Sequence, residues 1–464
     1  MKRRPETGPL PTRQLVRALL YDSFIWDAAD RVERQFPRDE AIGGRPRDYP
    51  LVMALVWAGL VAIFGSSRKV ERELACDESG WWDLVRDAAG DMRPGLEIPE
   101  APMRRYHYEW LREKHLTHDG ALFEICEQFR EHAAAQAVMI GLCDSAGGGS
   151  LTHPSLERVV AGDGKVITPL FKTHPDHPPK LNKRTGEIRR KRVDPSADNY
   201  TTGGGTPVFG TRFVFISTRG KGQNRRIILD VAHAPTEGGE AKWALEGMHR
   251  VLPGLPGVQL VVYDGAFRGK HLRELMKIDG VIAISRVSKG KDRYLGLADV
   301  RRPDGRIEKV EVQLLNGSPH LRRITVDGSI IPTPLRRVKT RRNRNLDGWR
   351  WYNDYRVPEE LGGGTCRLRL DQSTDDKGVD FNREENLRVI APDDPDHAAL
   401  YGLRADTESG NKQVDDSFLR ERAHTVGWRR QQLDMIMYSA RRNAEAVQLH
   451  RRVEQVEPPD RLAA

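Results

Sequence analysis

The change in hydrophobic periodicity near Asp144 constrains the fold of this chain more than any other feature. Before it, apolar residues recur three and four positions apart, as in LVRALLYDSFIWDAADRVERQF and GALFEICEQFREHAAAQAVMIGL, a spacing typical of amphipathic helices. After it come short strand-like runs separated by turn-rich segments, including GKVITPLF, FGTRFVFIS, NRRIILDVAHA and VQLVVYD. The sequence therefore predicts an all-helical domain over residues 1–143, followed by a part that contains a sheet.

Two later changes of pattern divide the rest of the chain. Residues 289–396 are rich in Gly, Pro and charged residues and hold short alternating pieces such as IEKVEVQL and CRLRLDQ, which predict strands. From residue 397 to 464 the helical spacing returns, as in DSFLRERAHTVGWRRQQLDMIMYSARRNAEAVQLHRRV. We therefore predict four segments: helical (1–143), α/β (144–288), β-rich (289–396) and helical again (397–464).

Composition narrows the classes of partner and compartment. The 464 residues include 75 Lys+Arg against 66 Asp+Glu, a formal net charge of +9 that suits a polyanionic partner. The four cysteines are far apart and form neither a zinc motif nor a disulfide framework, which fits a reducing cytoplasm. The basic N-terminus lacks the apolar run of an export signal, and the apolar stretch 50–65 is shorter than the roughly 20 residues of a membrane span. We expect a cytoplasmic protein in which 50–65 is a buried helix.

Two carboxylates occupy positions suited to binding. Asp264 directly follows the apolar run VQLVVY and precedes a helix-like segment, and ligands collect at such carboxyl ends of strands. A helix cap is the alternative role for Asp264. Asp163 lies between two glycines in VVAGDGKVITPLF, which allow close approach, although Asp-Gly is also typical of a hairpin turn. Asp144, after VMIGLC, is a rival for the first carboxylate.

The third carboxylate lies in YGLRADTESGNKQVDDSFLRE. On a helix, Tyr401, Arg404, Glu408 and Lys412, spaced three, four and four, share one stripe, whereas Asp406 points the other way. A carboxylate flanked by cations suits a metal beside a phosphate, because Arg makes forked contacts to phosphate oxygens. Ordinary ion pairs on a helix surface are the alternative explanation of such a stripe.

These elements together resemble the DDE transposases of bacterial insertion sequences, particularly the insertion sequence four group. The resemblance is carried by DGKVI, by a strand ending in Asp before Gly-x-aromatic, and by the signature Tyr-x2-Arg-x3-Glu-x6-Lys. Tyr401, Arg404 and Glu408 match that signature, but Asp415 stands where it has Lys, and Lys412 is a candidate replacement. Residues 44–75 are also similar to the helical N-terminal region of these transposases.

The resemblance implies an α/β fold class, with a ribonuclease H-like mixed sheet, helices around it, and C-terminal helices that complete the catalytic domain. Some members insert a β-rich domain between the second Asp and the Glu, and the 144 positions from 264 to 408 leave room for one. Asp163, Asp264 and Glu408 would hold two Mg²⁺ ions, or Mn²⁺, about 3.5 to 4 Å apart. Without metal, mutual repulsion should raise the pKa of at least one of them.

By the same resemblance, the enzyme would cleave DNA at the ends of an element and direct the freed 3′-hydroxyl at target DNA. We expect double-stranded DNA as the partner, bound by a homodimer. The densest basic runs, residues 180–193 and 335–345, predict salt-sensitive binding. The residues expected to contact DNA are Tyr401, Arg404, Lys412, Arg336, Arg337, Arg341 and Arg342. The aromatics of WRWY (349–352) offer faces for a base swung out of the duplex, with strand core as the favoured role.

Two other functions remain open from the sequence. The first is an inactive or host-adopted protein that binds DNA without cutting it, which Asp415 favours and the three retained carboxylates oppose. The second is a nuclease on the same fold that cuts without joining, which only the N-terminal resemblance opposes.

Overall fold

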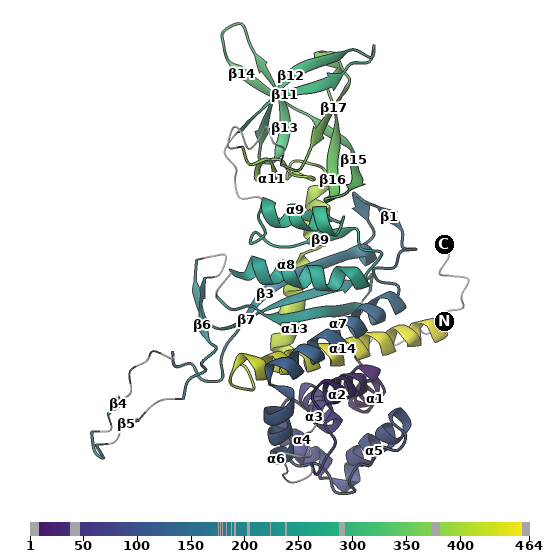
Figure 1. The fold of residues 1–464 in the computed structure, drawn as a ribbon, viewed down its shortest axis with the longest axis vertical. Coiled ribbons are helices and arrows are strands. Elements are labelled where there is room, and N and C mark those ends of the chain that lie inside the picture. Colours follow the sequence, from purple (N-terminus) through teal and green to yellow (C-terminus); the bar gives the residue numbers. More distant parts are fainter. Residues whose placement is uncertain are drawn as a thin grey trace, which may run out of the picture. The chain divides into compact units, whose positions relative to one another are not determined.

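The computed structural model describes most of the chain: residues 9–37, 47–174, 176, 178, 180–181, 183–186, 188–189, 192–201, 205–222, 224–236, 239–286, 293–372 and 381–456. The chain forms two compact units (Figure 1). The first unit comprises Met1–Gly141, Gly164–Trp243 and Ser409–Ala464. The second comprises Leu142–Asp163 and Ala244–Glu408.

The N-terminal part of the first unit is helical, as the periodicity predicts. Its α-helices are α1 (Thr12–Leu20), α2 (Ser23–Gln35), α3 (Val52–Phe64), α4 (Ser67–Leu74), α5 (Trp81–Met92), α6 (Arg105–Leu111) and α7 (Asp119–Met139). Every residue of α3 except Ile63 is buried, which confirms the prediction of a buried helix for the apolar stretch. In the described ranges no single helix is long and apolar enough to cross a membrane. Helices α3 and α4 are long and apolar enough only when taken together, and the chain bends by 105° between them.

A six-stranded mixed sheet follows the helices in the sequence. Its strands are β3 (Val159–Ile167), β6 (Asp198–Thr201), β7 (Pro207–Arg219), β8 (Arg226–His233), β9 (Leu260–Val262) and β10 (Ile282–Ile284). The order is β10-β9-β3-β7-β6, and β8 pairs with β7. Strand β9 is parallel to both β3 and β10, whereas β7 is antiparallel to β6 and β8. Helices α8 (Gly239–Val251) and α9 (Gly269–Ile278) make the connections to β9 and β10, so the fold is mixed α/β.

Helix α14 (Trp428–Val456) packs against β8 and supplies the hydrogen bonds that a further strand would make. The side chain of Gln432 accepts from the backbone amide of His233 at 2.7 Å and donates to the carbonyl of Val231. Asn443 accepts from the amide of Ile228 and donates to its carbonyl, both at 2.8 Å. The side-chain amides of Gln432 and Asn443 thus pair with backbone groups of β8. Because an unpaired strand edge can recruit other strands, this pairing protects the edge.

The segment predicted to be β-rich forms a second sheet, drawn in green in Figure 1. Its strands are β11 (Arg293–Arg301), β12 (Ile307–Leu315), β13 (Ser318–Ile324), β14 (Ile330–Pro334), β15 (Arg336–Asn345), β16 (Gly348–Arg356) and β17 (Thr365–Arg369). The order is β14-β13-β12-β11-β17-β16-β15, so β15, the strand with the densest basic sequence, lies at an edge. Its only described strand partner is β16, which runs antiparallel to it.

The C-terminal helices are more interrupted than the periodicity predicts. After the short α11 (Arg383–Asn386), the stripe from Tyr401 to Lys412 is divided between α12 (His397–Gly402) and α13 (Ala405–Val414). A π-helical turn, Asp415–Leu419, ends in two residues with left-handed backbone, Arg420 (φ 46°) and Glu421 (φ 87°), so the chain leaves the helix before α14 begins. Of the basic run 180–193, the structure describes a small hairpin, β4 (Lys180–Leu181) with β5 (Ile188–Arg189), and several positions of the run lie outside the described residues.

Candidate active site

The register between β3 and β9 brings two of the predicted carboxylates together. The parallel pairing of β3 with β9 ends at Ala161 and Val262, and Asp163 and Asp264 each follow that last pair by two residues. Because side chains alternate along a strand, residues two positions on from a matched pair share a face. Asp163 is thus inside a strand rather than in a hairpin turn. Asp264 is not the cap of α9, which begins at Gly269; its Oδ1 accepts from the amide of Ala266 at 2.8 Å.

The two glycines beside Asp163 make room for protein side chains. A Cβ on Gly162 would lie 2.8 Å from atoms of Met248 and Tyr263, and one on Gly164 would meet the carboxyl group of Glu240. Side chains from other elements therefore pack closely against both glycines that flank Asp163. The strand is buried at this point, and the side chain of Asp163 is only 13% exposed.

Arg404 connects the first and third carboxylates. It lies in the turn between α12 and α13, with Nη2 3.5 Å from Oδ1 of Asp163 and Nη1 3.3 Å from Oε1 of Glu408. Asp264 also acts electrostatically on both Asp163 and Arg404. Asp163, Asp264 and Glu408 therefore all act on one guanidinium, and the side chain of Glu408 is 66% exposed.

Burial and charge both perturb this group. Burial raises the pKa of Asp163, Arg404 opposes the rise, and repulsion from Asp264 and Glu408 adds to it. For Arg404, burial lowers the pKa, but the attraction of Asp163 and the other anionic neighbours outweighs it, so the pKa is raised. The predicted repulsion is present, yet loss of solvent is the larger cause of the shift at Asp163.

The donor chemistry of the site fits a hard divalent cation. Three carboxylates and one guanidinium leave an excess of two negative charges, and Mg²⁺ prefers carboxylate oxygens while keeping several of its waters. The geometry is not yet that of a metal site, because no three His, Cys, Asp or Glu side chains in the described ranges are arranged to hold an ion. Asp163 and Glu408 would bind a cation only after Arg404 releases them.

The remaining predicted residues differ in their surroundings. The ring of Tyr401 stacks on His397, with centroids 5.6 Å apart. Lys412 is exposed and has no ion pair within the described part of the chain. The side chain of Asp406 lies outside the described residues. Asp144, the rival first carboxylate, accepts from the amide of Ala146 at 3.0 Å in a loop and is not among the groups that shift the pKa of Asp163.

Asp415, where the family signature has Lys, forms an ion pair that sequence reasoning missed. Its Oδ2 lies 2.7 Å from Nζ of Lys165, whose side chain is 10% exposed. Lys165 follows Asp163 by two positions in β3, so strand alternation sends both side chains to the same face. The Lys in DGKVI was the available signal: a cation two residues after a candidate ligand in a predicted strand.

Most of the predicted DNA-binding arginines of β15 are engaged within the protein. The side chain of Arg337 is 7% exposed and binds Asp394 (2.6 and 3.0 Å) and Asp396 (2.7 Å). Arg341 binds Asp354 at 2.6 Å. Arg342 donates to the carbonyl of Gly280 and lies over the ring of Trp349, 4.5 Å from its centroid. Arg336 is exposed and, unlike the other three, has no side-chain partner within the described part of the chain. We therefore omit Arg337 from the proposed DNA contacts.

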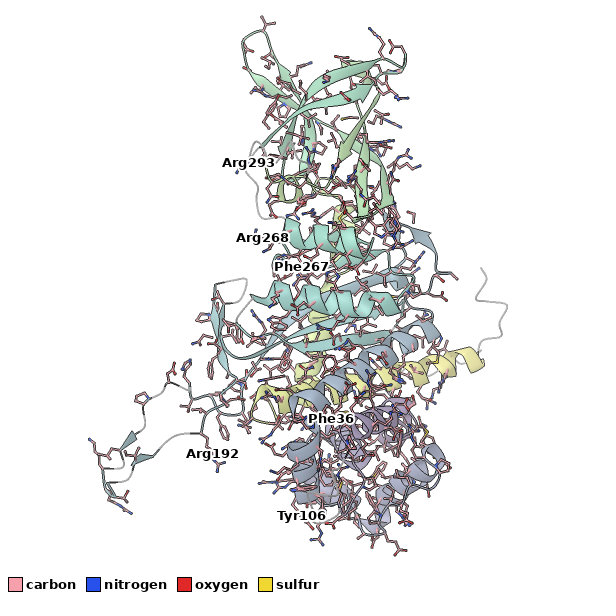
Figure 2. All side chains as sticks on the ribbon, in the orientation of Figure 1. Phe36, Tyr106, Arg192, Phe267, Arg268 and Arg293 are labelled. Carbon is pink, nitrogen blue, oxygen red and sulfur yellow. The ribbon has the colours of Figure 1, made fainter. Side chains whose placement is uncertain are left out.

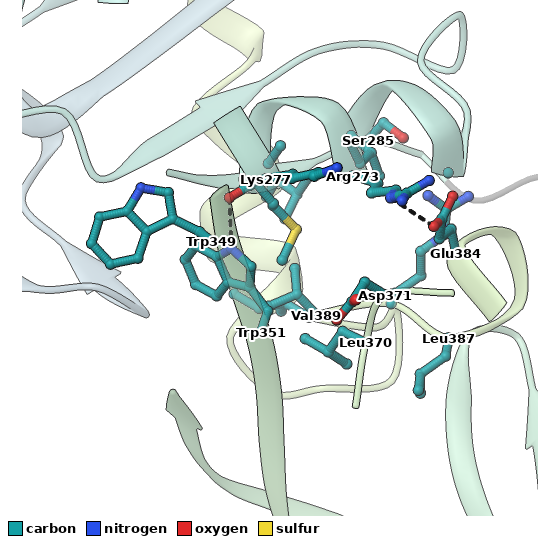
Figure 3. A pocket seen from close by; sticks show the side chains of 17 residues that line it. Arg273, Lys277, Ser285, Trp349, Trp351, Leu370, Asp371, Glu384, Leu387 and Val389 are labelled. Atoms are coloured by element: carbon teal, nitrogen blue, oxygen red, sulfur yellow. Dashed lines mark hydrogen bonds and ion pairs between the residues drawn. The ribbon is translucent and has the colours of Figure 1, made fainter. Parts of the chain in front are cut away.

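Two of the four aromatic residues of β16, Trp351 and Tyr355, belong to the core of the second unit, and Trp349 and Tyr352 are half-buried. Trp351 is 2% exposed, and its Nε1 donates to the carbonyl of Met276 at 2.6 Å, one of the dashed lines in Figure 3. Trp349 lines the small pocket drawn there, which has a volume of about 40 Å³. Because one water needs about 10–15 Å³ by the same kind of measure, the pocket holds a few waters and no nucleobase.

No protein-family model, curated protein or solved structure matched the chain when it was compared with them. The chemistry of the site is therefore derived from its own residues. The carboxylates of Asp163, Asp264 and Glu408 supply donor oxygens of the kind that divalent cations prefer, and a guanidinium such as that of Arg404 can bind either carboxylate or phosphate oxygens.

Proposed function

We propose that the chain is a DDE-type transposase, which cleaves DNA at the ends of an insertion sequence and joins the freed 3′ ends to target DNA. The observation that carries the proposal is the parallel β3–β9 pairing, because Asp163 and Asp264 each follow its last pair, Ala161 and Val262, by two residues. Glu408, on a helix that follows the seven-stranded sheet, completes the predicted order of carboxylates. A mixed sheet with parallel β3, β9 and β10 and an antiparallel β7–β8 pair supports a ribonuclease H-like catalytic domain.

The proposed chemistry divides the work between rigid and adjustable residues. Asp163 lies within β3 and Asp264 two residues after the adjacent strand β9, so the sheet restricts the positions of both residues. Glu408 is largely exposed on α13 and can adjust when DNA enters. When bound, two Mg²⁺ ions would supply activation of the attacking water or hydroxyl and stabilisation of charge at phosphorus and on the departing oxygen. Arg404 would then exchange Asp163 for a phosphate oxygen.

The test is cleavage of a supercoiled plasmid that carries the DNA flanking the gene, with and without Mg²⁺. Asp264→Asn should abolish cleavage and leave DNA binding in EDTA unchanged, because the amide keeps the shape and loses the charge that holds a cation. Glu408→Gln should behave alike. Asp144→Asn and Asp406→Asn are the matched controls and should retain activity. If folded Asp264→Asn protein cleaves at the unmutated rate, the proposal fails.

A second candidate, a DNA-binding protein that does not cut, is favoured by the Asp415–Lys165 pair, since that position lacks the cation of the family signature. Wild-type protein that binds the flanking DNA in EDTA but never cleaves it in Mg²⁺ or Mn²⁺ would establish this candidate. Sequencing of the products separates a nuclease from a transposase, because only a transposase leaves 3′ ends joined to new DNA.

A further inference from the structure

The first unit contains an arginine-lined groove that sequence analysis did not single out. The groove has a volume of about 820 Å³ and lies among the end of α3, the start of α4, α6 and the segment from residue 419 to 430. We call it the arginine groove. Its main cationic residues, which come from four separate parts of the sequence, are Arg68, Arg105, Arg112, Arg192, Arg420 and Arg422. Figure 2 labels Arg192, on the segment between β5 and β6.

The positive charge of the groove is largely uncompensated. Arg68, Arg420 and Arg422 are exposed and form no ion pair or side-chain hydrogen bond within the ranges that the structure describes. Two acidic side chains line the groove. Glu109 lies 3.5 Å from Arg105.

The second acid of the groove, Asp434, is 5% exposed and accepts from the hydroxyl of Thr425 at 2.8 Å. Burial raises the pKa of Asp434 against the attraction of Arg112, which disfavours its negative charge. Neither acid therefore neutralises the exposed arginines.

The backbone at the groove is held in a costly conformation. Arg420 and Glu421 have φ values of 46° and 87°, in the left-handed region that side chains other than glycine rarely adopt. Opposite Arg420 lies Gly65 (φ 88°), the residue that caps α3, where a Cβ would lie 3.8 Å from the guanidinium carbon of Arg420. Strained residues of this kind cluster where position serves function. Here the strain fixes the direction in which Arg420 leaves the chain.

We infer that the arginine groove binds phosphate groups of a DNA backbone. Guanidinium forks match phosphate oxygens, and several of them around one concavity suit a chain of phosphates better than a single small anion. Small-molecule pockets are lined mainly by apolar and aromatic side chains, which this groove is not. The choice of DNA as the polyanion rests on the proposed function.

The test is the affinity of the full chain for a short fluorescein-labelled DNA duplex in EDTA, measured over a series of salt concentrations. The double variant Arg420→Ala/Arg422→Ala should bind about tenfold more weakly or worse at low salt, and the slope of log affinity against log salt should fall by about two. The matched control Arg34→Ala/Arg86→Ala removes two exposed arginines of the same unit outside the groove and should leave the slope unchanged.

A slope and affinity equal to those of the control would overturn the inference, as would lost binding to anionic phospholipid vesicles with DNA binding unchanged. Arg68→Ala/Arg192→Ala, on other elements lining the groove, repeats the test if the first pair fails to fold by circular dichroism. Because EDTA removes cleavage from the measurement, the two proposals fail separately. A groove that binds DNA in a protein that never cuts it would sink only the proposed function.

Discussion

Strand β15 and the arginine groove are both rich in arginine, but their arginines contact different things. In β15 the arginines are adjacent in sequence, and Arg337 and Arg341 are bound to aspartates of the same unit. In the groove they come from distant parts of the sequence, and Arg420 and Arg422 are exposed without such partners in the described chain. A run of basic residues in the sequence therefore does not show how much positive charge is available to a ligand. An arginine that is bound to an aspartate of its own unit is already engaged, whereas an exposed arginine without such a partner is available to an anion.

The largest effect of this contrast is expected at Arg337. Arg337→Ala would leave the nearly buried Asp394 without its cation and remove one partner of Asp396, so the free energy of unfolding should fall by about 3 kcal/mol. Urea denaturation measures it. Arg336→Ala, the exposed neighbour, is the control and should stay within about 0.5 kcal/mol of wild type. Unchanged stability together with a smaller salt slope for DNA binding would show that Arg337 contacts DNA, and would contradict the difference between β15 and the arginine groove.

At Arg420 we expect a substitution to raise the free energy of unfolding, which is the opposite of the effect at Arg337. Arg420→Gly removes an unpaired charge and a left-handed strain, so the protein should become more stable by about 1 kcal/mol while its affinity for duplex DNA falls. Thermal unfolding and the EDTA binding assay measure the two effects. Arg422→Ala lacks the strained backbone and should lose affinity with no gain in stability. A destabilised Arg420→Gly would show that the side chain of Arg420 holds the fold.

A smaller effect is expected at Asp163, where negative charge is unbalanced. Its pKa is raised in the folded protein, first by burial, so the charged carboxylate opposes folding above that pKa, and the opposition disappears below the unfolded value near 3.8. Asp163→Asn should therefore raise the urea midpoint at pH 7, and the gain should shrink as the pH falls toward 4. A variant that is less stable than wild type at pH 7 would mean that the attraction of Arg404 outweighs burial.

The elements that sequence analysis predicted well are those whose periodicity reports burial directly. The continuous apolar run of α3 is buried almost throughout. In β7, β8 and β12 the apolar residues that face a core recur along the strand, because side chains alternate between its two faces. The candidate carboxylates were found by the same logic, because Asp264 follows a buried strand. Their pairing required the β3–β9 register, which local pattern does not contain.

What sequence analysis missed depends on contacts between distant positions. Arg337 is separated from Asp394 by 57 residues, and Lys165 from Asp415 by 250. A helical stripe shows which side chains share a face, but not that the chain turns at Arg404 or leaves the helix at Arg420. The arginine groove was invisible for the same reason, since it draws single residues from segments with no common pattern.

Because the seven-stranded sheet lies between the candidate carboxylates in the sequence, these residues are synthesised at different times. Asp163 and Glu408 are 245 positions apart (408 minus 163), with all of β11–β17 between them. At a synthesis rate of about 5 to 20 residues per second, roughly 10 to 50 seconds separate their exits from the ribosome. During that interval Asp163 and Asp264 are already made, but the third carboxylate and Arg404 do not yet exist. A growing chain therefore carries an incomplete candidate site until residues 404 and 408 have been added.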